Sequence, residues 1–226
     1  MTGDGKTAEF MALPGSTEDR REVFARSLAG VIRVLGIEVA PEPEPADGRT
    51  WAHRARAALR GAWKDGVILS DESFDALLRA AVHDPDPSFN RQFVEPALNA
   101  FGHRRVQAAL LAYLLTGTDP ERAGAARAWY WSGMSLRMPQ VRAEHAAAAD
   151  DGPDPVPEWH EAALREFVRN EHLDVRRCIL PLLSLRKSAY PPELHALVDE
   201  ALATARSHPD EYIRHRVEHQ AGDSGR

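Results

Sequence analysis

The sequence predicts an all-α protein, because three features of the 226-residue chain favour helices over strands. One long stretch occurs a second time in similar form, and apolar residues recur at helical spacing along most of the chain. In addition, no window alternates apolar and polar residues as a half-buried strand does. We expect ten helices, arranged as five antiparallel pairs.

The duplication joins residues 75–98, which read DALLRAAVHDPDPSFNRQFVEPAL, to residues 161–183, which read EAALREFVRNEHLDVRRCILPLL. Identical residues occur at Ala76/Ala162, Leu78/Leu164, Arg79/Arg165, Val82/Val168, Arg91/Arg176, Pro96/Pro181 and Leu98/Leu183. The offset is 86 before the central turn and 85 after it. A duplication whose length changes only in a turn is typical of repeat proteins.

Composition narrows the class of protein. The net charge of −6 argues against a generally basic protein that coats nucleic acid, although it leaves a local basic face open. Cys178 is the single cysteine and cannot form an intramolecular disulfide, which favours a reducing compartment. The chain has no apolar run near the roughly 20 residues of a membrane span and no N-terminal signal core. We therefore expect a cytoplasmic protein that makes no contact with a membrane.

The first helix pair precedes the repeated stretch. Residues 1–15 are polar and contain glycine, so we expect them to be disordered. Ser16 or Thr17 can cap a helix that ends near Gly36. Residues 40–48, APEPEPADG, predict a stiff acidic linker because proline disfavours helix there. A second helix follows over residues 49–64.

The next two pairs have clear start and stop signals. We expect helices over residues 70–82, 86–101, 103–116 and 119–133. Asp86 is expected to cap the second of these, with Pro87 in its first turn and a kink at Pro96. Gly102 and Gly117 are expected to end two of them.

Residues 134–157 interrupt the helical pattern and are expected to be a loop insertion. Residues 146–157 within it are rich in alanine, aspartate and proline, so we expect them to form an exposed loop, with or without a short helix before it. Four helices then complete the fold, over residues 158–172, 174–186, 191–206 and 210–220, with a kink at Pro181. The folded unit is expected to span residues 16–221 as one domain, with residues 222–226 as a tail.

The second helix of each later pair opens with an aspartate shortly before an arginine. The four occurrences are Asp86…Arg91, Asp119…Arg122, Asp174…Arg176 and Asp210…Arg214. With the segments LDVRRCILPLL and HPDEYIRHRV, this pattern resembles the HEAT-like, armadillo-type helical repeats. The resemblance implies a right-handed α-solenoid of about five helix pairs. In that family most solenoids bind proteins, while a minority bind DNA and act as alkyl-base glycosylases.

Arginine recurs on the second helices, at Arg54, Arg56, Arg60, Arg91, Arg122, Arg127, Arg176, Arg177, Arg214 and Arg216. A stripe of free arginines along a concave face would suit phosphates or an acidic protein segment. The alternative is a structural ladder, in which Arg91, Arg176 and Arg214 pair with turn aspartates. Arg177 and Arg216 are the better candidates for free charge.

Three consecutive aromatic residues, Trp129–Trp131, cannot all face one apolar stripe, because successive helical residues point about 100° apart. At least one should be partly exposed, and an exposed aromatic residue is a typical binding anchor. Alternatively, the loop insertion covers them and completes a core, and the small residues at 123–128 favour close packing. The candidate partner-binding residues are Trp129, Trp131, Arg127, Arg177 and Arg216.

No catalytic, cofactor-binding or metal-binding residue is assigned. A glycosylase would need a carboxylate close after the aromatic run, but Ser132 and Gly133 stand there. His215 and His219 are one helical turn apart, yet Arg214 and Arg216 disfavour a bound cation. Cys178 lies on an apolar stripe and is expected to be a core thiol.

Three functions follow from these observations. The first is a non-enzymatic HEAT-like scaffold that binds a protein partner through its concave face. The alternative is a nucleic-acid-binding protein related to the HEAT-like alkylpurine DNA glycosylases, which would use the arginine stripe. A third is an enzyme with a deep pocket near Trp129 and Trp131 that contains a perturbed carboxylate.

Overall fold

The computed structural model describes residues 18–39, 49–134, 138–144 and 153–222, and this part of the chain is mostly helical. Its α-helices are α1 Glu18–Val34, α2 Arg49–Asp65, α3 Asp71–His83, α4 Arg91–Phe101, α5 His103–Thr116, α6 Asp119–Ser132, α7 Val156–Arg169, α8 Leu173–Ile179, α9 His195–Arg206 and α10 Glu211–Gly222. The predicted all-α class and the ten predicted helices are confirmed for these residues. The expected disordered segment 1–15 and linker 40–48 lie outside them.

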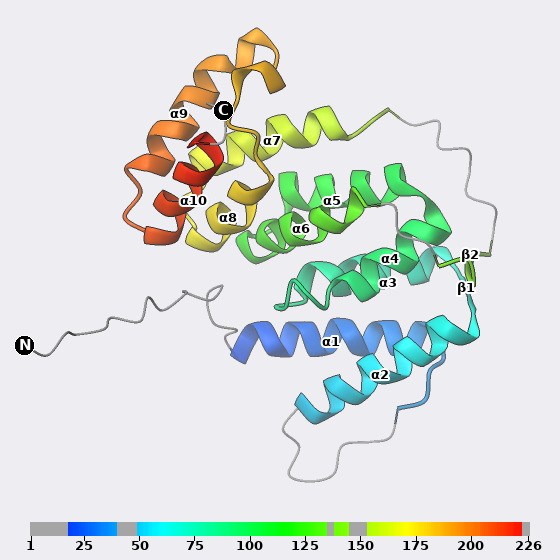
Figure 1. Ribbon diagram of the computed structural model, residues 1–226. Coiled ribbons are helices and arrows are strands. Elements are labelled where there is room, and N and C mark those ends of the chain that lie inside the picture. Colours follow the sequence, from blue (N-terminus) through cyan, green and yellow to red (C-terminus); the bar gives the residue numbers. More distant parts are fainter. Residues whose placement is uncertain (1–17, 40–48, 135–137, 145–152, 223–226) are drawn as a thin grey trace, which may run out of the picture.

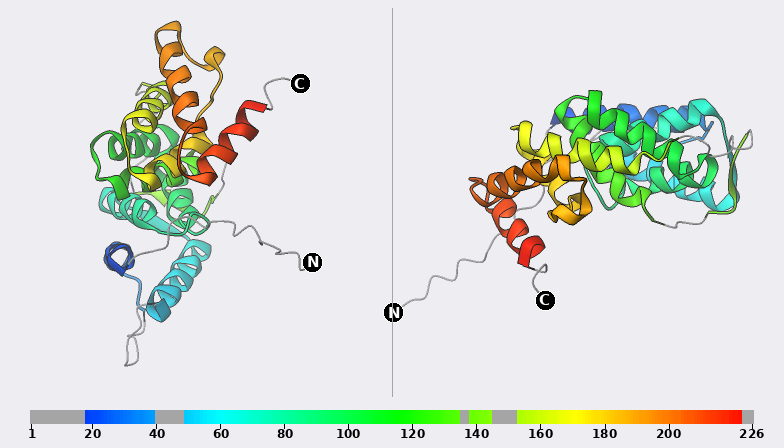
Figure 2. Two further views of the ribbon diagram at one scale, coloured as in Figure 1. Left: turned by 90° about the vertical axis from the view of Figure 1, so that its left-hand side faces the viewer. Right: turned by 90° about the horizontal axis from the view of Figure 1, so that it is seen from above.

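Successive helix pairs lie on one another in chain order, from α1 and α2 at one end to α9 and α10 at the other (Figure 1). Two sets of contacts connect the pairs. The first helix of a pair contacts the first helix of the next pair, as in α1 with α3 and α7 with α9. The second helix contacts the second helix of the next pair, as in α4 with α6 and α6 with α8. The left-hand view of Figure 2 shows the same progression from another side.

One hydrophobic core extends from Phe24 in α1 to Val217 in α10. Its largest fully buried side chains include Phe93, Trp159 and Phe167. The small residues of α6 allow it to pack closely on α3. At Gly124 the approach is so close that an added Cβ would lie 1.9 Å from the carbonyl oxygen of Val82. No helix in the described part of the chain has the length and apolar character to cross a membrane.

Two short strands correct the expectation that no strand forms. Strand β1, Val67–Leu69, pairs in parallel with β2, Val141–Ala143. Strand β2 lies within the predicted loop insertion 134–157, where Val141 is buried and the backbone N–H of Met138 donates to the Asn99 side chain at 2.7 Å. Residues 138–143 are therefore packed against α4 and β1. Most of the predicted exposed loop at residues 146–157 lies outside the described residues, and its end already belongs to α7, which begins at Val156.

Helix boundaries differ from the predictions around the prolines. Helix α4 begins at Arg91, and Asp86 instead accepts the backbone N–H of Ser88 in the preceding turn, at 2.8 Å. Helix α8 ends at Ile179, and residues Leu180–Leu182 form a 3-10 turn that contains Pro181. Proline has no N–H and clashes with the carbonyl one turn back, which favours this break. Pro96, its counterpart in the first copy, stays inside α4.

The two copies of the repeated stretch form the same turn. The side chain of Asp84 accepts a hydrogen bond from the backbone N–H of Asp86 at 3.0 Å. In the second copy, the side chain of Asn170 accepts one from the backbone N–H of His172 at 2.8 Å. These are Asx turns, in which a side chain two residues back replaces a backbone acceptor. Because Asp84 and Asn170 are 86 positions apart, the turn follows the offset of the duplication.

Candidate functional site

The turn arginines bind backbone carbonyl groups more often than aspartates. Arg122 donates to the carbonyl of Leu114 at 3.2 Å, and Arg176 donates to those of Phe167 and Val168 at 3.2 and 3.1 Å. These carbonyls lie in the last turns of the preceding helices, where such groups lack helical partners. Arg214 similarly donates to the carbonyls of His208 and Pro209.

The prediction that Arg91, Arg176 and Arg214 pair with turn aspartates is therefore wrong. Arg91 pairs with Glu95 on its own helix at 3.1 Å, and Arg176 and Arg214 donate to backbone carbonyl groups. The most buried of the long-range pairs use different arginines: Arg20–Asp174, Arg56–Asp84 and Arg177–Asp210. Each joins an arginine of one element to the acid of a distant turn or helix start.

The two arginines expected to carry free charge differ in their surroundings. The side chain of Arg177 is only 4% exposed and is held by the carboxylate of Asp210, so the expectation of free charge is wrong for Arg177. Arg216 is half-buried on α10, and its Nε lacks a hydrogen-bond partner. Desolvation explains the difference, because a guanidinium as deeply buried as that of Arg177 requires a counter-charge.

The aromatic run divides between core and surface. Trp129 is buried and stacks on Trp159, with ring centroids 3.9 Å apart and planes 3° from parallel. Trp131 is half-buried, and its Nε1 donates to the side chain of Asn90 at 2.8 Å. Tyr130 is 54% exposed, which confirms that one of the three reaches the surface. Trp129 is thus a core residue and not an exposed anchor.

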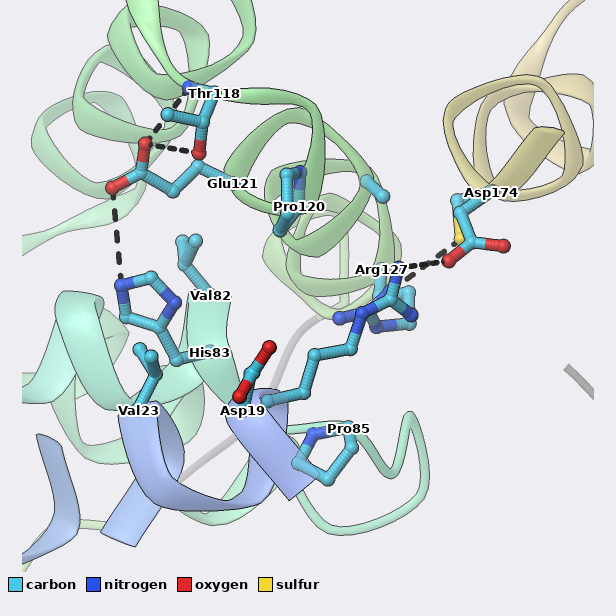
Figure 3. Close-up of a pocket in the computed structure, with 13 residues that line it drawn as sticks. Asp19, Val23, Val82, His83, Pro85, Thr118, Pro120, Glu121, Arg127 and Asp174 are labelled. Carbon is cyan, nitrogen blue, oxygen red and sulfur yellow. Dashed lines mark hydrogen bonds and ion pairs between the residues drawn. The ribbon is translucent and has the colours of Figure 1, made fainter. Parts of the chain in front are cut away.

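A pocket of about 260 Å³ lies where α1, α3, α6 and α8 meet, and Figure 3 shows it from close by. Its lining combines apolar and charged side chains. The lining residues are Asp19, Arg20, Val23, Val82, His83, Pro85, Thr118, Pro120, Glu121, Ala123, Arg127, Asp174 and Cys178. Of the predicted site residues, only Arg127 lines it, because the two tryptophans, Arg177 and Arg216 lie elsewhere.

Glu121 occupies one wall of the pocket and is held locally. Its carboxylate accepts the backbone N–H and the hydroxyl of Thr118, each at 2.8 Å, which caps the start of α6. Burial by itself raises the pKa of Glu121, but these hydrogen bonds together with nearby His83 and Arg79 lower it overall. His83 lies 3.8 Å from Glu121, and burial lowers the pKa of this histidine (Figure 3).

Arg127 connects the turn after α3 to α8. Its Nη2 donates to the backbone carbonyl of Asp84 at 3.2 Å, and its Nη1 donates to the Sγ of Cys178 at 3.5 Å. Burial raises the pKa of the Cys178 thiol, so Cys178 is a neutral acceptor. The expectation of a buried thiol is confirmed, although Cys178 also lines the pocket.

Asp84 is the most perturbed carboxylate that the structure describes, and the sequence interpretation missed it. It is fully buried and accepts a hydrogen bond from Arg56 at 2.7 Å. Burial raises its pKa to about 6, and the Arg56 charge opposes that shift. The guanidinium of Arg56 in turn lies 4.5 Å from the ring centroid of Phe24. The tandem DPDP at residues 84–87 is the signal in the sequence, and it contains Asp84 as well as Asp86, the expected cap.

His215 and His219 lie against each other on the exposed face of α10, with their Nε2 atoms 3.1 Å apart. Within the residues that the structure describes, no three His, Cys, Asp or Glu side chains are grouped so that they could hold a metal ion. Searches of protein-family models, of curated proteins and of solved structures found no match to this chain.

Proposed function

We propose that this chain is a HEAT-like α-solenoid that binds a protein partner and does not catalyse a reaction. The succession of helix pairs supports the repeat architecture, as do the equivalent Asx turns of Asp84 and Asn170. Stacked helix pairs present an extended surface whose side chains can vary without changing the fold, which suits binding.

The pocket between α1, α3, α6 and α8 is the observation that carries the proposal. It is an apolar hollow, walled by residues such as Val23, Val82 and Pro120, with charged groups around it. Binding hot spots commonly combine an apolar hollow for an anchor side chain with polar groups that fix its orientation. The four helices that build it, α1, α3, α6 and α8, come from four successive pairs, so the stacking itself creates the site.

The use of arginine favours a protein partner over nucleic acid. Most arginines of the proposed stripe donate to groups within the chain: Arg56, Arg91, Arg122, Arg127, Arg176, Arg177 and Arg214. Nucleic-acid affinity depends mainly on cations that neutralise phosphates. Arginines that already bind carboxylates or carbonyls contribute less to such a surface, and the net charge of −6 opposes it further.

Two groups whose pKa values burial raises, Asp84 and Cys178, have surroundings that suit a structural role. The carboxylate of Asp84 is held by Arg56, and Asp84 is not among the residues that line the pocket. Cys178 does line it, but a raised thiol pKa disfavours the thiolate that nucleophilic catalysis uses. Both features favour a binding role.

The proposal is tested by affinity purification from a lysate of the native host, with and without nuclease. We expect a stoichiometric protein that survives nuclease treatment. Val23→Trp places a large side chain in the pocket from α1 and should abolish this co-purification. Leu115→Trp, at an exposed position of α5, is the matched control and should retain it. Nucleic acid as the retained species, or protein lost on nuclease treatment, would favour the alternative.

A further inference from the structure

Arg127 is the starting point, because the pocket's two arginines differ in how their charge is balanced. Arg20 is paired with the carboxylate of Asp174. For Arg127, the described residues supply only neutral acceptors, the carbonyl of Asp84 and the sulfur of Cys178. A guanidinium at a partly enclosed pocket whose direct hydrogen bonds all go to neutral groups can attract an anion.

The guanidinium of Arg127 also has spare hydrogen-bonding capacity. It carries five N–H donors in a planar fork, and its two described bonds use two of them. Its Nε is buried without a hydrogen-bond partner. A carboxylate is the natural complement of such a fork, because two parallel N–H···O bonds can form.

The rest of the lining defines what else the ligand carries. Val82, Pro85, Pro120 and Ala123 provide apolar wall around Arg127. The volume of about 260 Å³ lies below the roughly 300–1,000 Å³ of pockets that hold drug-sized molecules. This size fits one or two side chains of a partner segment better than a larger ligand.

Three carboxylates on the pocket restrict the ligand to a single negative charge. Asp174 is neutralised by Arg20, and Glu121 is held by Thr118. Asp19 is exposed in the first turn of α1, where the helix dipole favours an acid. A phosphate backbone would bring several charges past these acids, and their repulsion disfavours it. One carboxylate next to an apolar group avoids most of that repulsion.

We propose that this pocket recognises a partner segment by one aspartate or glutamate side chain, bound to Arg127, and by an adjacent apolar side chain, bound against Val82 and Pro120. The inference rests on the proposed function, since it names the chemistry that the protein partner presents. It makes Arg127 the specificity-determining residue of the site.

The test uses the whole chain and a phage-displayed library of short random linear peptides. We expect enriched peptides to share an acidic residue beside a large apolar one. Replacing that acid in the peptide by its amide should weaken binding to the wild type by about ten- to hundredfold, the range for hydrogen bonds to charged groups. The same peptide change should have little effect with Arg127→Gln, because the two changes remove one interaction.

Arg206→Gln, which removes an exposed charge in the last turn of α9, is the control and should bind as the wild type does. Enrichment of peptides without an acid would overturn the inference, as would equal losses in wild type and Arg127→Gln. So would tighter binding of a random DNA duplex at the same site. If no peptide is enriched, the pocket inference fails, while a partner still captured from lysate and lost with Val23→Trp keeps the proposed function.

Discussion

The contact between Gly124 and Val82 gives the sharpest test of the packing. Gly124 lies within α6, and its position allows the backbone of α6 to meet that of α3 directly. In Gly124→Ala the new Cβ would lie 1.9 Å from the carbonyl oxygen of Val82, about 1.5 Å short of ordinary contact at 3.4 Å. A backbone oxygen cannot rotate away as a side chain can, so the two helices must separate.

The sign of the effect depends on two opposing free energies. Alanine is favoured over glycine inside a helix by about 1 kcal/mol. Overpacking a buried contact typically costs about 1–3 kcal/mol, and a backbone clash lies at the upper end. Separating the helices also loosens the core around Ala123 and Ala126, which are buried beside the contact. We therefore expect Gly124→Ala to lower the free energy of unfolding by at least about 2 kcal/mol.

Gly61→Ala is the matched control, because it makes the same chemical change inside α2 where nothing lies within 4 Å of the new Cβ. It should raise stability by up to about 1 kcal/mol. Thermal unfolding followed by circular dichroism separates the two, since each kcal/mol corresponds to about 2–4 °C in a chain of this size. A Tm of Gly124→Ala equal to or above that of the wild type would refute the close α3–α6 contact.

Three further predictions concern buried charge. Arg177→Gln should lower the free energy of unfolding, measured in urea, by about 3–5 kcal/mol because it leaves the buried carboxylate of Asp210 without its counter-charge. The control Arg169→Gln, at an exposed position, should change it by less than about 0.5 kcal/mol, and similar values for the two variants would contradict the buried pair. Val198→Asp, at a fully buried position, should destabilise α9 far more than Leu197→Asp, which is half-buried, and equal losses of helical signal would show that the helix is rotated. Burial raises the pKa of Asp84 from 3.8 to about 6, so the folded state holds this proton more tightly, and the resulting stability is present below pH 3.8 and lost as the pH rises through about 6. Relative to Asp84→Asn, the wild type should gain about 1 kcal/mol between pH 7 and pH 5, and parallel pH profiles would contradict this.

The helices were predictable because their signals are local. Gly102 and Gly117 follow the last residues of α4 and α5, and Asp119 with Pro120 opens α6, as the sequence indicates. The short strands β1 and β2 were not predictable, since three residues are too few for an alternating pattern. The two strands pair because the chain comes back to β1 near residue 141, and no local sequence pattern predicts that contact.

The ion pairs were mispredicted because nearness in sequence is a poor guide to direction on a helix. Asp174 and Arg176 are two positions apart, so their side chains point to different sides of α8. Asp174 instead meets Arg20, which is 154 positions away. The pocket was missed for the same reason, as its lining comes from four helices and contains only one of the five candidate partner-binding residues, Arg127.

The position of Arg127 relative to the duplication gives it contacts with both copies. Its Nη2 reaches the carbonyl of Asp84 in the first copy, and its Nη1 reaches the thiol of Cys178 in the second. The pocket is thus the seam between the two copies, and Arg127, which belongs to neither, spans it. Arg127→Gln should therefore lower Tm as well as peptide affinity. Affinities have to be compared at a temperature where both proteins are fully folded, and the change in the peptide, which leaves the fold untouched, isolates recognition from stability.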